Sequence, residues 1–333
     1  MDIAGPPHAP AEFVSGKEVA VIGVVQHPVV VIGDVVVDIV IKPTGPIRIA
    51  SDTDSFIRLG LGGAGANTAI HLAREGVPTL FMGRVGDDAL GRLVRTALNE
   101  PLLTLAVEAT PDAPTGAIGI LVDDEGQRTM FPQRGANKYV DPQLVERNWP
   151  DHVRGLFVSG YALFEETTRA AARLAIEKAR AANVPVAIDP ASYANILDVG
   201  VDRFLEWCEG ATIILPNRHE ASVLAGGAAM SSELSNPQVH SAGSPSAPAG
   251  LDVQFDMDDV LDRLSRLFPT VVVKLDREGA IVRSGTDTVF VPAQSVPVVD
   301  TTGAGDAFNA GFFAAYLAGA ALNEALSAGN AAS

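Results

Sequence analysis

One stretch near the C-terminus, Val298–Phe308, constrains the fold most, and it reads VVDTTGAGDAF. Two β-branched residues come first, small residues follow, and a proline-free run with aromatic residues at helical spacing comes last. The pattern predicts a buried strand, a glycine turn and a helix. The backbone N–H groups of Gly303, Ala304 and Gly305 would then lie unpaired at the helix N-terminus, where the helix dipole favours negative charge. We therefore expect an anion site at this turn.

Asp306, at the start of the predicted helix, has two interpretations. A carboxylate at a helix start is most often an N-cap, which satisfies backbone N–H groups and has no chemical role. A phosphoryl-transfer site also needs a carboxylate beside its anion site, because a base must take the proton of the attacking hydroxyl. The residue types alone leave both interpretations open.

Residues 300–306, DTTGAGD, resemble the signature of the ribokinase-like (PfkB) sugar kinase family residue for residue. The resemblance implies that Asp306 is the catalytic base and that Gly303, Ala304 and Gly305 form the anion hole for the γ-phosphate of ATP. It also implies an α/β fold, a ribokinase-like three-layer sandwich with a mainly parallel sheet covered by helices, plus a small β lid. The alternation of strands and helices after residue 155 independently favours a parallel sheet.

Two segments of the N-terminal half carry candidate sugar contacts. Val29–Ile41 is predicted as one strand buried on both faces, with Asp38 near its C-terminal end, where open parallel sheets bind ligands. Taken alone, Asp38 could equally cap the following loop. The glycine-rich segment 60–69 opens a helix and resembles the Gly-Gly-x-Gly-x-Asn motif of the family. By this resemblance Asp38, Gly63 and Asn67 bind the sugar.

The same glycine-rich segment permits a competing interpretation. Gly60, Gly62 and Gly65 fit the dinucleotide pattern G-x-G-x-x-G, and Asp87 lies at a suitable distance from it. The preceding residues 51–58 carry several charges and do not look like a buried first strand. We therefore favour the kinase motif and keep a dinucleotide-dependent oxidoreductase as a rival hypothesis.

Polar residues follow two predicted strands of the C-terminal half. Asn217 and Glu220 come after a strand over 212–215, and their spacing fits a helix-capping box. It also fits the Asn-x-x-Glu motif of the family, by which both residues serve the ATP site and Glu220 holds Mg²⁺ through water. Lys274 ends a strand over 271–275, and it either approaches a nucleotide phosphate or lies in solvent.

Asp300 and Thr302 receive roles only through the resemblance. It implies that Thr302 contributes to the ATP site and that Asp300 contributes to a monovalent-cation site, which would take K⁺. Members of the family carry further residues after a segment like 329–332, and these complete the adenine pocket and the cation site. We therefore expect the C-terminus to be truncated, which would weaken ATP binding.

The chain is predicted to contain one kinase domain over residues 29–333, preceded by a flexible extension over 1–28. Lid strands are expected within about 39–57 and 115–132, where alternating apolar residues flank turn-forming ones. The segment 228–250 is rich in serine, alanine, proline and glycine, and is expected to be a flexible insertion.

The composition argues against other classes of function. A net charge of −16 over 333 residues disfavours nucleic-acid binding, which needs clustered lysine and arginine. The apolar run 19–41 is interrupted by polar and charged residues, so we predict no membrane span. The N-terminus lacks the basic start of a signal peptide, and the only cysteine, Cys208, is expected to be inert packing. A cytoplasmic location follows as the expectation.

Together these patterns predict an ATP-dependent sugar kinase. It would transfer the γ-phosphate to a primary hydroxyl of ribose, fructose, 2-keto-3-deoxygluconate or a similar sugar, with Asp306 as general base. A nucleoside kinase of the same family and a catalytically impaired sugar- or nucleotide-binding protein are the alternatives. The expected partners are the sugar, ATP and Mg²⁺, with no nucleic acid and no membrane, and a homodimer through the lid is a further hypothesis.

Overall fold

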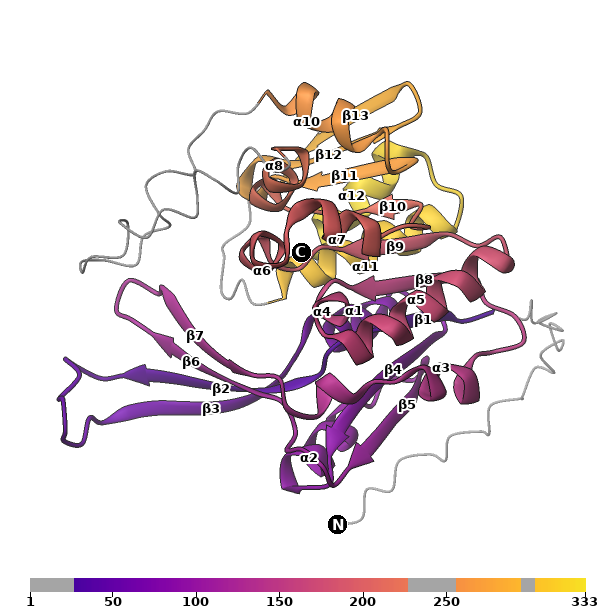
Figure 1. The fold of residues 1–333 in the computed structure, drawn as a ribbon. Helices are drawn as coiled ribbons and strands as arrows, with labels where there is room; N and C mark the ends of the chain where they lie inside the picture. Colours follow the sequence, from indigo (N-terminus) through magenta and orange to yellow (C-terminus); the bar gives the residue numbers. More distant parts are fainter. Residues whose placement is uncertain (1–26, 227–255, 295–302) are drawn as a thin grey trace, which may run out of the picture.

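The computed structural model describes residues 27–226, 256–294 and 303–333, which fold into two sheets and their covering helices (Figure 1). The expected extension over 1–28 lies outside the described residues except for its last two positions. The expected insertion over 228–250 also lies outside them, as do Asp300 and Thr302.

In the described part of the chain, the larger sheet has nine strands in the order β13-β12-β11-β10-β9-β8-β1-β4-β5. Neighbouring strands from β11 to β5 are parallel, whereas β12 and β13 form an antiparallel hairpin at one edge. The central strands are buried on both faces, which accounts for their β-branched sequences. The strands are β1 (Val29–Ile32), β4 (Thr79–Gly86), β5 (Leu103–Thr110), β8 (Gly155–Ser159), β9 (Val186–Asp189), β10 (Ile213–Ile214), β11 (Thr270–Lys274), β12 (Gly279–Ser284) and β13 (Asp287–Pro292).

Helices cover both faces of this sheet and create two apolar cores. The first core holds Val30 and Ile32 of β1, and the second holds Val29 and Val31 of the same strand. Two layers of helices therefore enclose one sheet, which confirms the predicted three-layer sandwich (Figure 1). The first core is covered by α3 (Pro142–Asn148), α4 (Tyr161–Phe164), α5 (Glu166–Ala181), α6 (Tyr193–Val199), α7 (Val201–Trp207), α8 (Arg218–Gly226) and α10 (Met257–Leu264). The second is covered by α1 (Ala64–Arg74), α2 (Ala89–Ala97), α11 (Ala304–Leu317) and α12 (Leu322–Ala332).

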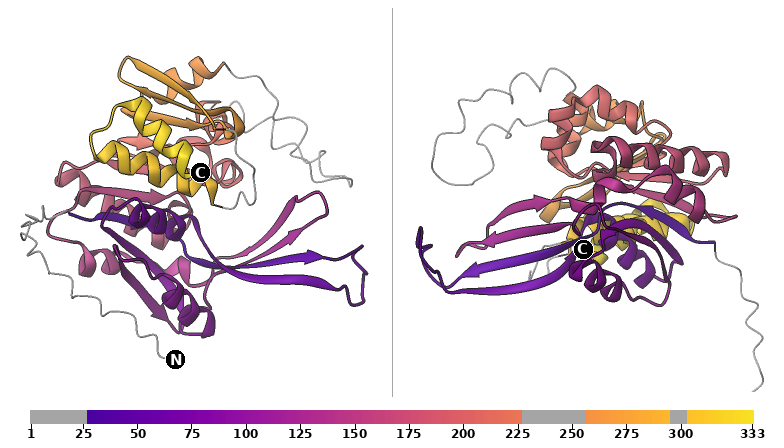
Figure 2. Two further views of the ribbon diagram at one scale, coloured as in Figure 1. Left: turned by 180° about the vertical axis from the view of Figure 1, so that it is seen from behind. Right: turned by 60° about the horizontal axis from the view of Figure 1, so that its bottom comes forward.

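A second, four-stranded sheet projects from the body, and we call it the lid sheet (Figure 2). Its strand order is β3-β2-β6-β7, with a parallel pair in the centre and an antiparallel pair on either side. The small separate sheet predicted from the sequence is thus confirmed. Its strands are β2 (Val36–Pro43), β3 (Ser55–Gly62), β6 (Ala117–Val122) and β7 (Arg128–Gln133), so the lid begins before and extends beyond the predicted range 39–57.

The prediction of a single strand over 29–41 is wrong. The chain leaves the larger sheet after Ile32 and joins the lid sheet at Val36, so β1 and β2 belong to different sheets. Gly33, at the break, packs tightly against α1, because a Cβ at this position would lie 2.6 Å from the Cα of Gly65. Apolar β-branched residues lie on both sides of the turn and are buried there, which hid the break in the sequence pattern.

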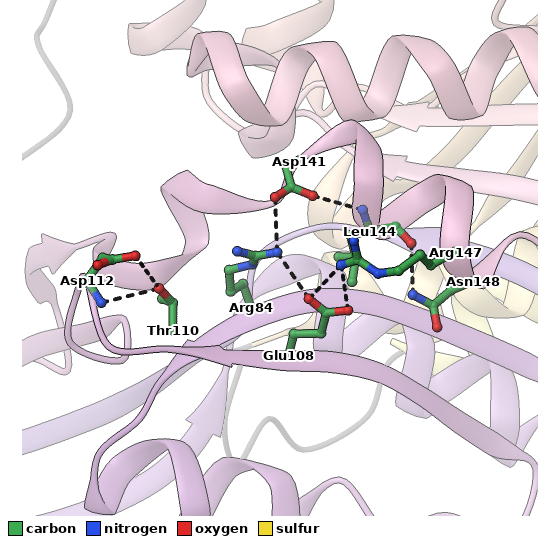
Figure 3. Close-up of polar contacts among 8 residues, drawn as sticks. All are labelled: Arg84, Glu108, Thr110, Asp112, Asp141, Leu144, Arg147 and Asn148. Carbon is green, nitrogen blue, oxygen red and sulfur yellow. Dashed lines mark hydrogen bonds and ion pairs between the residues drawn. The ribbon is translucent and has the colours of Figure 1, made fainter.

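The edge strand β5 was not predicted from the sequence. Figure 3 shows how it is held: Arg84 of β4 donates to Glu108 of β5 and to Asp141 before α3, each at 3.2 Å. Arg147 of α3 also donates to Glu108 at 2.9 Å. These ion pairs fasten the edge of the sheet to α3 and lie on the surface of the body, away from the motifs of the sequence analysis.

Among the described helices none combines the length and the apolarity that a membrane span requires. Cys208 is buried, and burial raises the pKa of its thiol, which agrees with inert packing.

Candidate active site

The residues predicted to bind the sugar meet where the lid sheet joins the body. Asp38 of β2 is buried, and its carboxylate packs against Gly62 at the end of β3, where a Cβ would lie 2.5 Å from either oxygen. Gly63, directly before α1, has a φ of 100° and lies against the backbone of Asp34. The N–H of Asn67 donates to the carbonyl of Gly63 at 2.9 Å. The structure therefore brings Asp38, Gly63 and Asn67 to one corner.

Asp306 lies in the first turn of α11 and contacts this corner. Asn67 Nδ2 donates to Asp306 Oδ2 at 2.9 Å, although the two residues are far apart in the chain. Gly303 occupies the N-cap position in the left-handed conformation, with a φ of 78°, so the interpretation of Asp306 as an N-cap is wrong. Burial, reinforced by the charge of Asp189, raises the pKa of Asp306 to about 7. The hydrogen bond from Asn67 acts in the opposite direction and lowers this pKa, but burial outweighs it. A carboxylate with this pKa can accept a proton near neutral pH.

Lys274, at the end of β11, lies on the other side of the same turn. Its ammonium is 3.8 Å from the point where a Cβ of Gly305 would stand, and it bonds Asp189 of β9 at 2.8 Å and Asn309 of α11 at 3.1 Å. The side chain is only 13% exposed, so the interpretation of Lys274 as a solvated strand end is wrong. Burial alone would lower its pKa, but the neighbouring carboxylates, Asp189 first, outweigh burial and raise the pKa above its ordinary value.

Asn217 and Glu220 form the capping box that their spacing predicts. The N–H and the Nδ2 of Asn217 each donate to a carboxylate oxygen of Glu220 at 2.9 Å, and the N–H of Glu220 donates to Asn217 Oδ1 at 2.9 Å. Burial, followed by the charge of Asp189, raises the pKa of Glu220 to about 7. The backbone of Lys274 pairs with this segment, since its N–H donates to the carbonyl of Pro216 at 2.9 Å. The cap and a role at the site are therefore compatible.

A cleft of about 780 Å³ opens beside Lys274. It extends from the ends of β9 and β11 to the N-terminus of α11 and the last residues of α12. Of the described residues predicted to serve ATP, Asn217, Glu220, Lys274, Ala304 and Gly305 line this cleft, whereas Gly303 lies toward Asn67, whose Nδ2 would be 3.3 Å from a Cβ on Gly303.

Comparison with known proteins identifies the architecture that carries this site. Residues 26–333 match the model of the pfkB family of carbohydrate kinases. The chain belongs to this family. The resemblance found in the glycine turn is therefore confirmed, and the kinase is an enzyme of the carbohydrate kinase class.

Two relatives illustrate the range of the family. A ribokinase from Haemophilus influenzae is 28% identical to this kinase over 282 residues, which cover 84% of this chain and 82% of the relative. An ATP-dependent ribose-1-phosphate kinase from Halopiger xanaduensis is 30% identical over 271 residues, which cover 81% of this chain and 78% of the relative.

Solved structures share the fold. An adenosine kinase from Sinorhizobium meliloti has a TM-score of 0.76 and 25% identity over 92% of each chain. A putative ribokinase II from E. coli in complex with ATP and Mg²⁺ has a TM-score of 0.71 and 22% identity, covering 92% of this chain and 91% of the other. The ribokinase-like fold predicted from the sequence is thus confirmed.

The dinucleotide interpretation of the glycine-rich segment is wrong. Gly60 and Gly62 lie within β3, which pairs antiparallel with β2 in the lid sheet. A dinucleotide turn instead joins a buried parallel strand to its helix. Here Gly65 allows close packing against Gly33, with a Cβ on Gly65 only 2.5 Å from the Cα of Gly33.

Sequence reasoning missed three polar residues of the site. Asp189 ends β9, a predicted strand, and its position at the carboxyl edge of a parallel sheet was an available signal. Asn309 lies one turn after Asp306 on the same helix and is fully buried, which an amide rarely is without a partner. Asp34 follows Gly33 directly, and it was hidden inside the segment taken for one strand.

The charges around Lys274 fit a divalent cation. Asp189, Glu220 and Asp306 all act on this one ammonium, and Asp189 raises the pKa of the other two. A set of carboxylate and amide oxygens with excess negative charge suits Mg²⁺, which keeps several of its waters. Among the described residues no three histidine, cysteine or acidic side chains are grouped so that they could hold a metal ion.

Proposed function

We propose that this kinase transfers the γ-phosphate of ATP to a primary hydroxyl of a sugar, with Asp306 as the general base. One observation carries the proposal: Asp306 lies between the corner of Asp38 and Asn67 and the cleft of Gly305 and Lys274. A base in that position reaches a hydroxyl bound on one side while the anion hole receives a phosphate on the other.

The chemistry follows from the two halves of the site. Asp38, Gly63 and Asn67 bind the sugar so that one hydroxyl points at Asp306. Asp306 accepts the proton of this hydroxyl, and the hydroxyl oxygen of the sugar bonds to the γ-phosphorus. The bond from that phosphorus to the bridging oxygen then breaks, and ADP leaves. The N–H groups of Gly303, Ala304 and Gly305 stabilise the charge on the transferred group, and Lys274 adds its ammonium next to Gly305.

Mg²⁺ is part of the proposal. Glu220 and Asp189 would hold it through water, with Asn217 orienting Glu220 by its two donors. When bound, the ion neutralises phosphate charge. ATP contact at Thr302 and K⁺ binding at Asp300 stay predictions from the family motif, because both residues lie outside the described ranges.

The acceptor class is proposed as a sugar, because several curated relatives are named ribokinase or deoxyribokinase. A nucleoside is the second candidate, favoured by the adenosine kinase of S. meliloti with its TM-score of 0.76. The two candidates differ in the group that the acceptor carries beside the sugar ring.

The direct test is ADP release with Mg-ATP across neutral sugars, sugar acids, sugar phosphates and nucleosides. We expect one sugar to raise the rate of ADP release at least tenfold above the rate without any acceptor. Turnover with a nucleoside alone would establish the second candidate. Binding of a sugar without turnover would contradict the proposal and favour a catalytically impaired binding protein.

The lid sheet is proposed as a dimer surface. It exposes large apolar side chains that a monomer would leave in water: Phe56, Ile57, Leu59, Met130 and Phe131. We expect sedimentation velocity to show a dimer, and we expect the double variant Phe56→Ser, Phe131→Ser to sediment as a monomer. A monomeric wild-type protein at micromolar concentration would contradict this. The predicted cytoplasmic location stays a prediction.

A further inference from the structure

In the described part of the chain, the backbone passes between the body and the lid sheet at four places. These are Gly33–Val35 before β2, Gly63 after β3, Thr115–Gly116 before β6 and Arg134–Gly135 after β7. They gather at the base of the lid sheet, where it meets the body (Figures 1 and 2). Asn137, in the short 3₁₀-helix η1 (Gly135–Tyr139), lies among them.

One side chain joins two of these crossings. The N–H of Val35 donates to Asn137 Oδ1 at 2.9 Å, and Asn137 Nδ2 donates to the carbonyl of Val35 at 2.8 Å and to the carbonyl of Arg134 at 2.9 Å. Asn137 is only 6% exposed, so water does not substitute for these bonds. It therefore holds the backbone of Val35 as a neighbouring strand would.

A third crossing packs on the same amide. A Cβ on Gly116 would lie 2.4 Å from Asn137 Nδ2, so the chain before β6 passes directly over it. The N–H of Val37 in turn donates to the carbonyl of Gly116 at 2.9 Å, which starts the pairing of β2 with β6. The central pair of lid strands is thus fixed at its base around Asn137.

The position of Asp38 depends on these contacts of Asn137 where the lid sheet meets the body. Asp38 follows Val35 by three residues in an extended strand, and a shift of one residue would turn its carboxylate to the opposite face. Asp34, on the other side of Val35, is held by Arg134 at 3.2 Å, and Arg134 lies 3.8 Å from the ring centroid of Tyr161. Val35 is therefore fixed by its own bonds to Asn137 and by the ion pair of the preceding Asp34.

We propose that Asn137 is a positioning residue for the sugar. It acts through Val35 and β2 to hold Asp38 in its corner, and it leaves the nucleotide cleft to other residues. The inference rests on the proposed function, in which Asp38 binds sugar hydroxyls. It predicts that the loss of Asn137 raises the KM for the sugar and leaves the KM for ATP nearly unchanged.

The test is Asn137→Ala, measured with the sugar that wild type accepts. We expect kcat/KM for the sugar to fall about 10- to 100-fold, mainly through KM, because small misplacements of binding groups are this costly. The KM for ATP should stay within about twofold. In the free protein, the amides of Val35 and Val37 should exchange hydrogen faster than in wild type. Asn137→Asp, which keeps the acceptor for the Val35 N–H, supplies a milder variant if Asn137→Ala does not fold.

Val260→Ala is the matched control, because Val260 is buried in α10, at the opposite end of the larger sheet from the lid sheet (Figure 1). It should lower the melting temperature without changing the KM for the sugar. Equal changes in both KM values for the Asn137 variants would overturn the inference. If wild type turns over no acceptor, the proposed function fails, and unchanged exchange at Val35 and Val37 would then overturn the positioning role independently.

Discussion

Replacing Asp306 with asparagine is expected to lower kcat by about 10²–10⁴-fold, with the KM for ATP and for the sugar largely kept. Asparagine keeps the shape of the side chain and an oxygen for the Asn67 donor, but it cannot accept the proton of the attacking hydroxyl. Steady-state kinetics with the accepted sugar measures both constants. If the variant kept the turnover of wild type, Asp306 would not be the general base.

The same variant should not fail by unfolding. Burial raises the pKa of Asp306 from its ordinary value of 3.8 to about 7, so the fold loses stability as the pH rises between these two values, and the loss is complete at pH 8. A neutral asparagine removes this cost, and we expect the variant at pH 8 to melt at or above the temperature of wild type. Asp256→Asn, at the exposed start of α10, is the control and should leave kcat unchanged.

The second large effect is on stability. Lys274→Met keeps the length of the buried stem and removes the ammonium, which leaves Asp189 without the partner that it holds at 2.8 Å. Breaking a buried pair in this way costs about 3–5 kcal/mol. Urea denaturation at pH 8 measures the loss. Lys178→Met removes a partly exposed pair with Glu146 and should cost at most about 1 kcal/mol.

The loss at Lys274 should also depend on pH, with a sign that follows from the carboxylates. Without the ammonium, the pKa values of Glu220 and Asp306, already raised to about 7, rise further. A carboxyl group with a raised pKa in the folded state is favoured in its protonated form, so it destabilises the fold as the pH rises. The variant should therefore lose less stability at pH 5.5 than at pH 8. An equal loss at both values would contradict the electrostatic account.

The sequence predicted the chemistry better than the geometry of the site. The anion site at Gly303–Gly305 was predicted from glycines at a helix N-terminus, whereas the roles of Asp306, Gly63 and Asn67 came from the resemblance to the family. The contact between Asn67 and Asp306 could not be found in this way. It joins residues that only the packing of α1 against α11 brings together.

The errors in the strand assignment and in the list of site residues have separate physical causes. The two strands on either side of Gly33 were merged because burial in either sheet selects the same β-branched residues. The end of the predicted strand marked Asp189 as a candidate, but its bonds and those of Asn309 to Lys274 and to each other span three elements, which no local pattern encodes. Local chemistry can be read from a chain, whereas pairings across the sheet edge require the fold.

The pH dependence of kcat/KM for the sugar tests the central claim most directly. The free enzyme should become active as Asp306 loses its proton, so the rate should rise with pH through a midpoint near 7, the raised pKa of Asp306. Glu220 has a raised pKa near the same value, so the measurement is made on wild type and on Glu220→Gln. The account predicts a lower rate but the same midpoint in the variant. A midpoint that vanishes with Glu220, or a rate that stays flat from pH 5.5 to 8.5 in wild type, would contradict it.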